Sequence, residues 1–335
     1  MRRRGIALVL SAGLLLAPVL AGCGGGGGGH RPSSSPKSAA TNPLTGEPGR
    51  PSGPVLGIKV DDTAAGRPQF GLGSADLVYV ESAEGGLTRL IAIYASHRPG
   101  AVGPVRSVRS SDPEILGPFG PMALGFSGGS TGVLDTFGAS ALVDASVDAH
   151  PKPYHRESGR RAPYNLVVDV GALSGEIGKL GKAAGVRDIG LHWASHGPSG
   201  SAPRVSRFTV TMGNTRVEFG WDSSAGRWVR RQDGRTVTGA DGKPVTTGNV
   251  LVQFCSVTPD FTDIDQAGHP APFTHAVGSG RAVLFRDGRM IEGTWRRASA
   301  SDRTRYTDRD GAELALRPGG AWVVLAPTGS PLDTG

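Results

Sequence analysis

Charged side chains recur through the first half of the chain at positions where they could form a single site. Arginine presents a rigid, planar set of donors that matches phosphate and carboxylate groups, and nearby acids can hold its guanidinium in place. The pattern therefore predicts a concave polar site that binds an anionic ligand. The residues assigned to this ligand-binding site are Asp61, Arg67, Gln69, Glu84, Arg89, Arg106, Arg109 and Asp112.

The same residues allow other interpretations. If burial shifted their pKa, Asp61 or Glu84 could act as acid and base in a hydrolase or transferase that acts on an envelope polymer. Alternatively, the arginines and carboxylates could form a structural ion-pair network that joins loops. Asp61, Asp62 and Glu84 carry hard oxygen ligands, but the surrounding arginines argue against a metal. We therefore expect no metal and no cofactor, and favour a binding protein over an enzyme.

Two further motifs resemble catalytic or metal-binding patterns. The residues around Ser127 fit the G-x-S-x-G pattern of a nucleophile elbow, but a chain with 53 glycines gives chance matches easily. His192 and His196 have the spacing of two metal ligands on one helix face. Glycine and proline flank this pair, and they also flank His150 and His155. We therefore expect exposed loop histidines at all four positions.

The N-terminus has the organisation of a secretory signal that ends at a cysteine. Three arginines open the chain, and residues 5–20 are apolar or small. This stretch contains Pro18 and is shorter than the roughly 20 residues of a spanning helix. The tetrad Leu20-Ala21-Gly22-Cys23 resembles a bacterial lipobox, whose cysteine receives a diacylglyceryl group. We expect a signal peptide over residues 1–22 and a lipid anchor on Cys23, at the extracytoplasmic face of the membrane.

The composition narrows the range of partners. The formal charge of +7 includes the three arginines of the signal, so its removal leaves about +4, enough for only a weak attraction to anionic lipid or wall polymer. Basic runs with interleaved aromatic residues are absent from the sequence, so we expect no nucleic-acid binding. Residues 23–41 are rich in Gly, Ser and Pro and predict a disordered linker after the lipidated cysteine. Cys255 lies in an apolar run and is expected in the core.

Strands and helices of a first globular part, over residues 42–200, must position the candidate site. Short apolar runs between turns predict strands at 55–60, 75–80, 90–94 and 121–126, and a short helix at 132–137. A helix is expected to start at Ser111-Asp112-Pro113, with a capping side chain and proline in its first turn. Arg106 and Arg109 would then lie beside a helix N-terminus, which also favours anions.

Another helix is expected from Val170, capped by Asp169, to about Ala184. Its apolar residues Leu173, Ile177 and Leu180 would share one face. Together these elements predict a mixed α/β, sandwich-like domain for the first part.

The second globular part, over residues 201–328, has a different pattern of apolar and polar residues. Apolar and polar residues alternate in short runs, and Asp-Gly or Gly-Asn pairs recur between them. This pattern predicts a mainly antiparallel β-domain, and the fold class of the whole chain is expected to be α+β. Residues 329–335 are assigned to a tail. Tryptophans in strand-like runs are expected to pack in the core, and they are Trp221, Trp228, Trp295 and Trp322.

In order and spacing, motifs along the mature chain resemble the YerB-like or DUF3048 family of bacterial lipoproteins. The motifs that carry the resemblance are Asn42-Pro43-Leu44-Thr45-Gly46, Ile58-Lys59-Val60-Asp61-Asp62, Arg67-Pro68-Gln69, Ala75-Asp76-Leu77-Val78-Tyr79, Glu84-Gly85-Gly86-Leu87-Thr88-Arg89-Leu90, Gly103-Pro104-Val105-Arg106-Ser107-Val108-Arg109, Gly128-Gly129-Ser130, Arg161-Ala162-Pro163-Tyr164-Asn165, Phe285-Arg286-Asp287-Gly288, Gly293-Thr294-Trp295 and Leu316-Arg317-Pro318-Gly319-Gly320-Ala321-Trp322.

The resemblance implies an α+β N-terminal domain, a mostly β C-terminal domain and no established reaction. Two positions depart from the family pattern, because Asp62 stands where asparagine is usual and Tyr164 where histidine is usual. A catalytic histidine at that second position is therefore not expected. The expected protein is a membrane-anchored lipoprotein that binds an anionic ligand or an envelope protein partner.

Overall fold

The structure, a computed structural model, describes residues 40–197, 202–264 and 268–335. These residues belong to one compact unit. The predicted signal peptide, the lipid site at Cys23 and nearly all of the predicted linker lie outside the described residues. Within the described part of the chain, none of the helices has both the length and the apolar character needed to cross a membrane.

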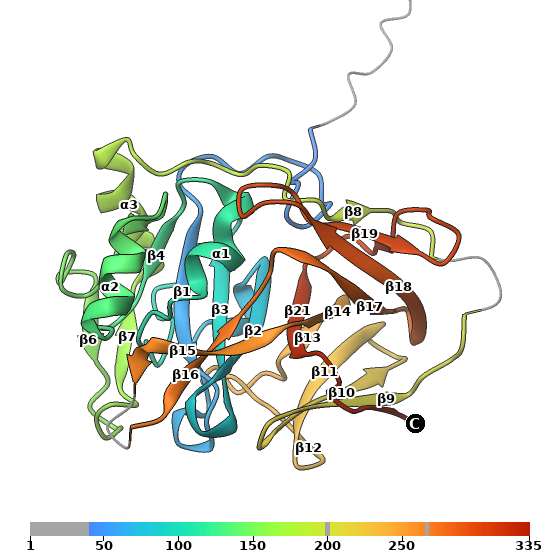
Figure 1. Cartoon of the computed structure of the whole chain (residues 1–335). Helices are drawn as coiled ribbons and strands as arrows, with labels where there is room; N and C mark the ends of the chain where they lie inside the picture. Colours follow the sequence, from blue (N-terminus) through green and yellow to red (C-terminus); the bar gives the residue numbers. More distant parts are fainter. Residues whose placement is uncertain (1–39, 198–201, 265–267) are drawn as a thin grey trace, which may run out of the picture. The chain divides into compact units, whose positions relative to one another are not determined.

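A ten-stranded mixed sheet forms the centre of the fold (Figure 1). Its strands, in order across the sheet, are β19 (Arg305–Asp308), β18 (Arg289–Arg297), β17 (Gly278–Arg286), β14 (Asn249–Cys255), β21 (Ala321–Pro327), β2 (Leu77–Ala83), β3 (Leu87–Tyr94), β1 (Leu56–Asp61), β4 (Ala123–Gly125) and β5 (Val143–Asp144).

Strand β21 joins the two halves of this sheet. It lies between β2 and β14 and runs parallel to both, with Ala321 paired to Leu77 on one side and to Asn249 on the other. Strands from both sides of the predicted boundary near residue 200 therefore share one sheet. The boundary between two domains stays a prediction.

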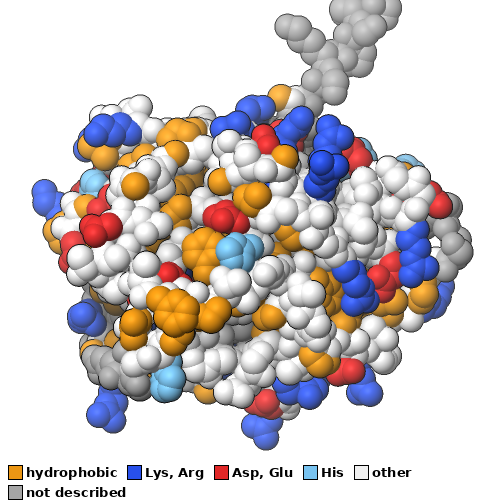
Figure 2. Space-filling view, in the orientation of Figure 1, with side chains coloured by type: hydrophobic (Ala, Val, Ile, Leu, Met, Phe, Trp, Pro, Cys, Tyr) orange, Lys and Arg blue, Asp and Glu red, His pale blue; other side chains and the backbone are white. Residues whose placement is uncertain are grey.

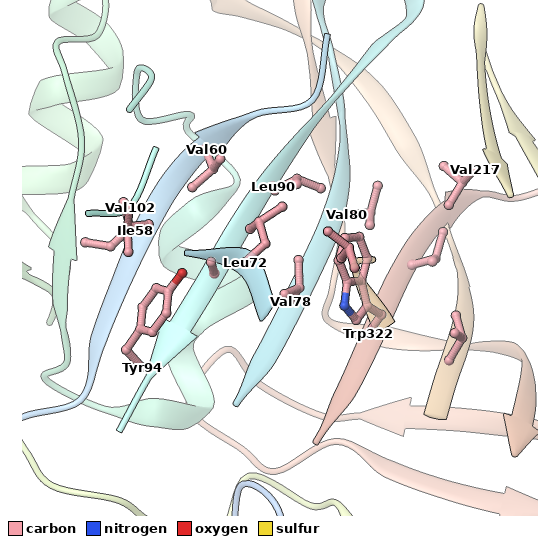
Figure 3. Packing of buried hydrophobic residues seen from close by; sticks show 14 of the residues in the cluster. Ile58, Val60, Leu72, Val78, Val80, Leu90, Tyr94, Val102, Val217 and Trp322 are labelled. Carbon is pink, nitrogen blue, oxygen red and sulfur yellow. The ribbon is translucent and has the colours of Figure 1, made fainter. Parts of the chain in front are cut away.

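Both faces of the large sheet are buried at its central strands, which explains the continuous apolar runs of these strands. Successive side chains alternate between two hydrophobic clusters. Leu56, Ile58 and Val60 of β1 belong to the first cluster, and Val78 and Val80 of β2 join them there (Figure 3). The intervening residues of the same strands face the second cluster.

Three α-helices cover these faces, namely α1 (Asp112–Leu116), α2 (Thr131–Gly138) and α3 (Val170–Leu180). α1 and α2 pack on the second cluster, and α3 packs on the first. α3 begins as predicted, because Asp169 accepts a hydrogen bond from the N–H of Ala172. It ends earlier than predicted, since Gly181 takes a left-handed conformation (φ 64°) that closes the last turn. Leu180 is consequently 46% exposed instead of buried.

The predicted start of α1 is correct, but its cap is not. Pro113 occupies the first turn, whereas the side chain of Ser111 makes no capping hydrogen bond. Because α1 is only five residues long, its N-terminus is also a poor anion site.

A second, antiparallel sheet packs on the first hydrophobic cluster, as the alternating pattern predicted. Its strands are β12 (Arg235–Thr236), β11 (Arg227–Gln232), β10 (Thr215–Asp222), β9 (Arg207–Met212) and β22 (Leu332–Thr334), with β13 (Thr246–Thr247) beside β11. β22 pairs with β9, although it falls in residues 329–335, which the sequence pattern assigned to a tail.

Aromatic rings join the two sheets. Phe208 of β9 packs edge-on against Trp228 of β11, with ring centroids 5.2 Å apart, and stacks on Phe285 of β17. Trp228 is fully buried as predicted, whereas Trp221 is only partly buried.

Short ribbons and tight turns complete the described part. The ribbons are β15 (Val257–Ile264) with β16 (Pro270–Thr274), β8 (His192–Trp193) with β20 (Ala315–Leu316), and β6 (Tyr154–Arg156) with β7 (Leu166–Val168). Asp233 and Asp287 have positive φ at predicted Asp-Gly turns. Cys255 is a buried free thiol, and burial raises its pKa to about 12. The expected mixture of strands and helices is confirmed, and strands predominate. The sandwich-like detail stays a prediction.

The aromatic contact between the sheets gives a stability prediction. Phe285→Ala should lower the free energy of unfolding by about 3–5 kcal/mol, because it leaves a cavity where the side chain is fully buried. Urea unfolding measures this change. Phe261→Ala is the matched control: its ring is 74% exposed, so the loss should stay within about 0.5 kcal/mol. Equal losses in the two variants would contradict this account of the core.

Candidate functional site

Three neighbouring strands end in charged residues on the same face of the large sheet. β1 and β2 both pair with β3, and the register places Asp61 opposite Arg89 and Arg89 opposite Glu81. Alternation along β1 puts Lys59 on this face as well, two residues before Asp61. The second hydrophobic cluster lies on this face together with α1. The apolar surface of the sheet therefore continues into a group of charges near α1.

Lys59 forms the deeper part of this charged group. Its ammonium group pairs with Glu81 and lies 2.8 Å from Asp112 Oδ1, and all three side chains are fully buried. Ser111 Oγ donates to Glu81 Oε2 at 3.3 Å. Burial and the nearby carboxylate of Asp112 raise the pKa of Glu81 to about 7, against the opposing charge of Lys59. This interaction ties β1, β2 and α1 together.

Asp61 occupies the shallower part and is fully buried. Its Oδ1 accepts hydrogen bonds from the N–H of Thr63 at 2.7 Å and from its hydroxyl at 2.5 Å. Its Oδ2 lies 3.4 Å from Arg106 Nε and 4.0 Å from Arg89 Nη1. A Cβ at Gly66 would lie 2.3 Å from Asp61 Oδ1, so this close approach requires glycine. Asp61 therefore orients two arginines, and the turn of residues 63–66 covers its carboxylate.

Arg109 pairs with Glu84 at the outer edge of the group. Its guanidinium nitrogens lie 2.6 and 2.7 Å from the two carboxylate oxygens of Glu84. Its backbone N–H donates to Asp112 Oδ2 at 2.8 Å, which links the outer edge to the deeper part. Burial alone would raise the pKa of Glu84, but the charge and the hydrogen bond of Arg109 lower it overall. Glu84 is therefore an ionised partner of Arg109.

We call Asp61, Glu84, Arg89, Arg106 and Arg109 the arginine cluster. Its buried atoms without a hydrogen-bond partner among the described residues include Asp61 Oδ2, Arg89 Nε and Arg106 Nη1. Such atoms are costly to bury, and proteins usually satisfy them with water or a ligand. Within the cluster three guanidinium groups meet two carboxylates, and Glu81 and Asp263 also act electrostatically on Arg109. The side chains of Arg106 and Arg109 are 21% and 12% exposed, so solutes reach them from solvent.

Two of the predicted site residues belong to a separate network around Asp62. Arg67 Nη2 lies 3.1 Å from Asp62 Oδ1, and Gln69 Nε2 donates to the carbonyl oxygen of Asp61 at 3.1 Å. Asp62 Oδ2 also lies 3.4 Å from Arg230 Nη2, which β11 contributes. Arg67 and Gln69 therefore help to fasten the loop after β1 to the second sheet, and the structure does not bring them into the arginine cluster.

Several residues near the site were missed by sequence reasoning. Lys59 and Glu81 were detectable, because strand alternation places each on the face that carries Asp61 or Arg89. Tyr164 was considered only as a departure from the family pattern. Its ring centroid lies 5.4 Å from the guanidinium carbon of Arg106, so it forms one wall beside that arginine. The sequence around Tyr164 does not indicate this contact, because the contact depends on the conformation of the loop between β6 and β7.

The serine motif does not have the geometry of a nucleophile elbow. β4 ends at Gly125 and α2 begins only at Thr131, so Ser127 lies in an extended connection. A nucleophile elbow requires a sharp turn from strand to helix at the serine. The glycines are better explained by the turn before α2, where Gly128 has φ 73°.

Three of the four candidate histidines, His150, His155 and His192, each lie beside a single carboxylate. His150 lies 3.0 Å from Glu176, and His192 lies 3.4 Å from Glu313. The loop assignment is wrong for His155 and His192, which lie in the short strands β6 and β8. Among the described residues, no group of three or more His, Cys, Asp or Glu side chains is placed to hold a metal ion.

The raised pKa of Glu81 gives a pH prediction. A carboxyl whose pKa is higher in the folded state stabilises the fold at low pH, and that contribution is lost as the pH rises through about 7. Wild-type stability should therefore fall between about pH 5 and pH 8 more steeply than that of Glu81→Gln. Urea unfolding across this range measures the difference.

Glu84→Gln is the matched control for this prediction. The pKa of Glu84 is lowered, so its contribution is lost as the pH falls, and the variant should alter only the acid limb of the profile. Identical slopes for the wild type and Glu81→Gln above pH 5 would contradict the titration of Glu81.

Comparisons with known proteins agree on one family. The N-terminal domain model of DUF3048, a family of proteins of unknown function, matches residues 44–183, and its C-terminal domain model matches residues 208–323. A Bacillus subtilis (strain 168) protein named "Putative lipoprotein YerB" is 26% identical over 281 residues, which cover 81% of each chain. The crystal structure of the YerB protein from Bacillus subtilis has the same fold, with a TM-score of 0.73, 24% identity, and coverage of 88% of this chain and 99% of that one. The chain therefore belongs to the DUF3048 family.

Proposed function

We propose that the protein is a lipid-anchored lipoprotein of the extracytoplasmic membrane face whose arginine cluster binds an anionic ligand. The observation that carries the proposal is a buried guanidinium donor, Arg106 Nη1, that has no partner among the described residues. It belongs to an arginine that is partly open to solvent, beside the partly exposed Arg109. An anion beside Arg106 and Arg109 would accept hydrogen bonds from these guanidinium groups.

The proposed anchor is the lipid on Cys23. It rests on the lipobox-like tetrad that ends at this cysteine and on the name of the Bacillus subtilis relative, which describes that protein as a putative lipoprotein. A diacylglyceryl group supplies two acyl chains, and two chains suffice for stable attachment.

An envelope-polymer hydrolase or transferase that uses Asp61 or Glu84 receives less support. A general acid or base needs a carboxyl group that is free to exchange a proton with substrate. Both oxygens of Glu84 pair with Arg109, and Asp61 is buried beneath Thr63, Gly66 and its arginine partners. This arrangement suits carboxylates that orient arginines better than carboxylates that transfer protons.

Substitution of the two partly exposed arginines, Arg106 and Arg109, tests the binding proposal. Arg106→Ala and Arg109→Ala should each weaken the binding of inorganic phosphate by roughly tenfold or more, because each removes a charged donor. Arg106→Lys should have an intermediate effect, since it keeps the charge and loses the planar fork. Phosphate titration followed by NMR of the arginine side chains measures the affinity.

Arg235→Ala is the control, because Arg235 is an exposed arginine of β12 outside the cluster. Circular dichroism and thermal unfolding check that each variant still folds. If Arg106→Lys is folded and the wild type binds no phosphate, the proposal fails. If both alanine variants unfold, the arginines are structural and the proposal also fails.

A second candidate function is the docking of an envelope protein on the surface around β15. The exposed large hydrophobic side chains of the described residues include Leu87, Leu134, Phe261 and Ile264. α2 contacts β15, and Leu87 lines a groove of about 380 Å³ with residues of β15 and β16. Figure 2 shows hydrophobic side chains gathered where Figure 1 draws this ribbon. Apolar patches of this kind often mark protein interfaces.

Phe261→Ser tests this second function. Affinity purification of the lipidated protein from its own membrane, followed by mass spectrometry, should recover a partner with the wild type. The partner should be lost with Phe261→Ser, because the most exposed ring of the patch is removed. Leu180→Ser is the control, since Leu180 is exposed on α3, outside the patch. Recovery of the same proteins with all three chains would exclude docking through this surface.

A further inference from the structure

Strand β6 and the loop between β6 and β7 place additional basic residues next to the arginine cluster. Residues 152–164, which include β6 and most of this loop, contain four basic side chains against a single glutamate, a net charge of +3 with histidine neutral. Glu157 is also the partner of His155, at 3.2 Å. The positive charge of this segment therefore remains largely unneutralised within the segment itself.

Contacts fix this loop against the site. Arg160 Nη1 donates to the carbonyl oxygen of Gly66 at 3.2 Å, its Nη2 donates to that of Pro68, and its guanidinium lies over the ring of Phe70 at 4.6 Å. Gly66 in turn lies directly against the carboxylate of Asp61. Arg160 therefore contacts Gly66, which in turn contacts Asp61 of the arginine cluster.

Near the end of the loop, Tyr164 contacts Arg106 of the arginine cluster. The backbone N–H of Tyr164 donates to the carbonyl oxygen of Arg161 at 2.9 Å, so the two residues share one turn. The Tyr164 ring contacts the guanidinium of Arg106. Asn165 holds Arg156 through its side-chain oxygen at 2.8 Å and donates to the carbonyl oxygen of Arg160. Backbone and side-chain contacts thus connect four arginines through Tyr164 and Asn165. We call these arginines the basic rim: Arg106, Arg156, Arg160 and Arg161.

Most of the basic rim is not neutralised by acids. Among the described residues, Asp61 is the carboxylate that pairs with Arg106, and Arg156, Arg160 and Arg161 form no ion pair. Arg156 and Arg161 are exposed. Guanidinium groups that bond only to neutral oxygens keep their charge and part of their donor capacity available for an external anion.

We propose that the ligand is a linear chain with several phosphate groups, which runs from the arginine cluster along the basic rim. This inference rests on the proposed anion binding at Arg106 and Arg109, and it names the class of ligand. A single phosphate offers one anionic group to the arginines of the cluster and the basic rim. A flexible chain of phosphates offers one group to each of several arginines, and each further contact adds to affinity.

The test compares inorganic phosphate with linear polyphosphate on the full chain, by isothermal titration calorimetry at several salt concentrations. Polyphosphate should bind more tightly than phosphate by roughly tenfold or more, with a steeper salt dependence, since more counterions are released. The double variant Arg156→Glu and Arg161→Glu should lower polyphosphate affinity by roughly tenfold and leave phosphate affinity nearly unchanged. Arg235→Glu, an exposed charge reversal on β12, should change neither.

Each other outcome overturns the inference in a distinguishable way. Equal affinities for phosphate and polyphosphate, with no effect of the double variant, would confine the ligand to the arginine cluster and leave the proposed function intact. Absence of binding for both probes would remove the proposed function itself. Vesicles with phosphatidylglycerol, compared with phosphatidylcholine vesicles, form the last arm. Binding to the anionic vesicles that the double variant abolishes, without polyphosphate binding, would assign the basic rim to a membrane surface.

Discussion

A buried charge must be paired, and this constraint shapes the end of the large sheet where β1, β2 and β3 meet. The sheet is covered on both faces, so charged residues in its strands lose their water. The ammonium group of Lys59 pairs with the carboxylates of both Glu81 and Asp112, and this pairing compensates for the lost hydration. The pairing also fixes the position of α1, and α1 in turn holds the backbone of Arg109 through Asp112. The geometry of the arginine cluster therefore depends on a contact that lies below it.

The two parts of the charged group differ in the balance of charge and in access to solvent. The deeper part is closed and contains two acids and one base, one acid having a raised pKa. The shallower part is partly open and contains more arginine than acid. The deeper part, which is closed to solvent, supports the fold. The shallower part is open and has more guanidinium groups than carboxylates, which suits the recognition of an anion. The basic rim extends this excess along the surface and has few acids of its own.

Much of the fold could be predicted from local pattern. The apolar runs of β1, β2 and β3, the alternation of β9 and β10, and the Asp169 cap are local signals, and each corresponds to an observed element. The insertion of β21 beside β2 could not be predicted, because a parallel pairing between distant segments leaves no local trace. The same limit applies to the site. The arginines were recognisable by type, but the separation of Arg67 and Gln69 from the cluster depends on a contact between Asp62 and Arg230, which are 168 residues apart in the sequence.

The position of β21 also has a consequence for how the protein is made. It is the strand that connects β2 with β14, yet it follows both of them in the sequence and is therefore synthesised after both. Until it arrives, β2 has an unpaired edge with a row of free N–H and C=O groups, and such edges are prone to associate with other chains. Contacts between residues so far apart in sequence also form slowly. Folding of this chain therefore includes an interval in which β2 is present but its neighbour β21 is not, and association with other chains is most favoured in that interval.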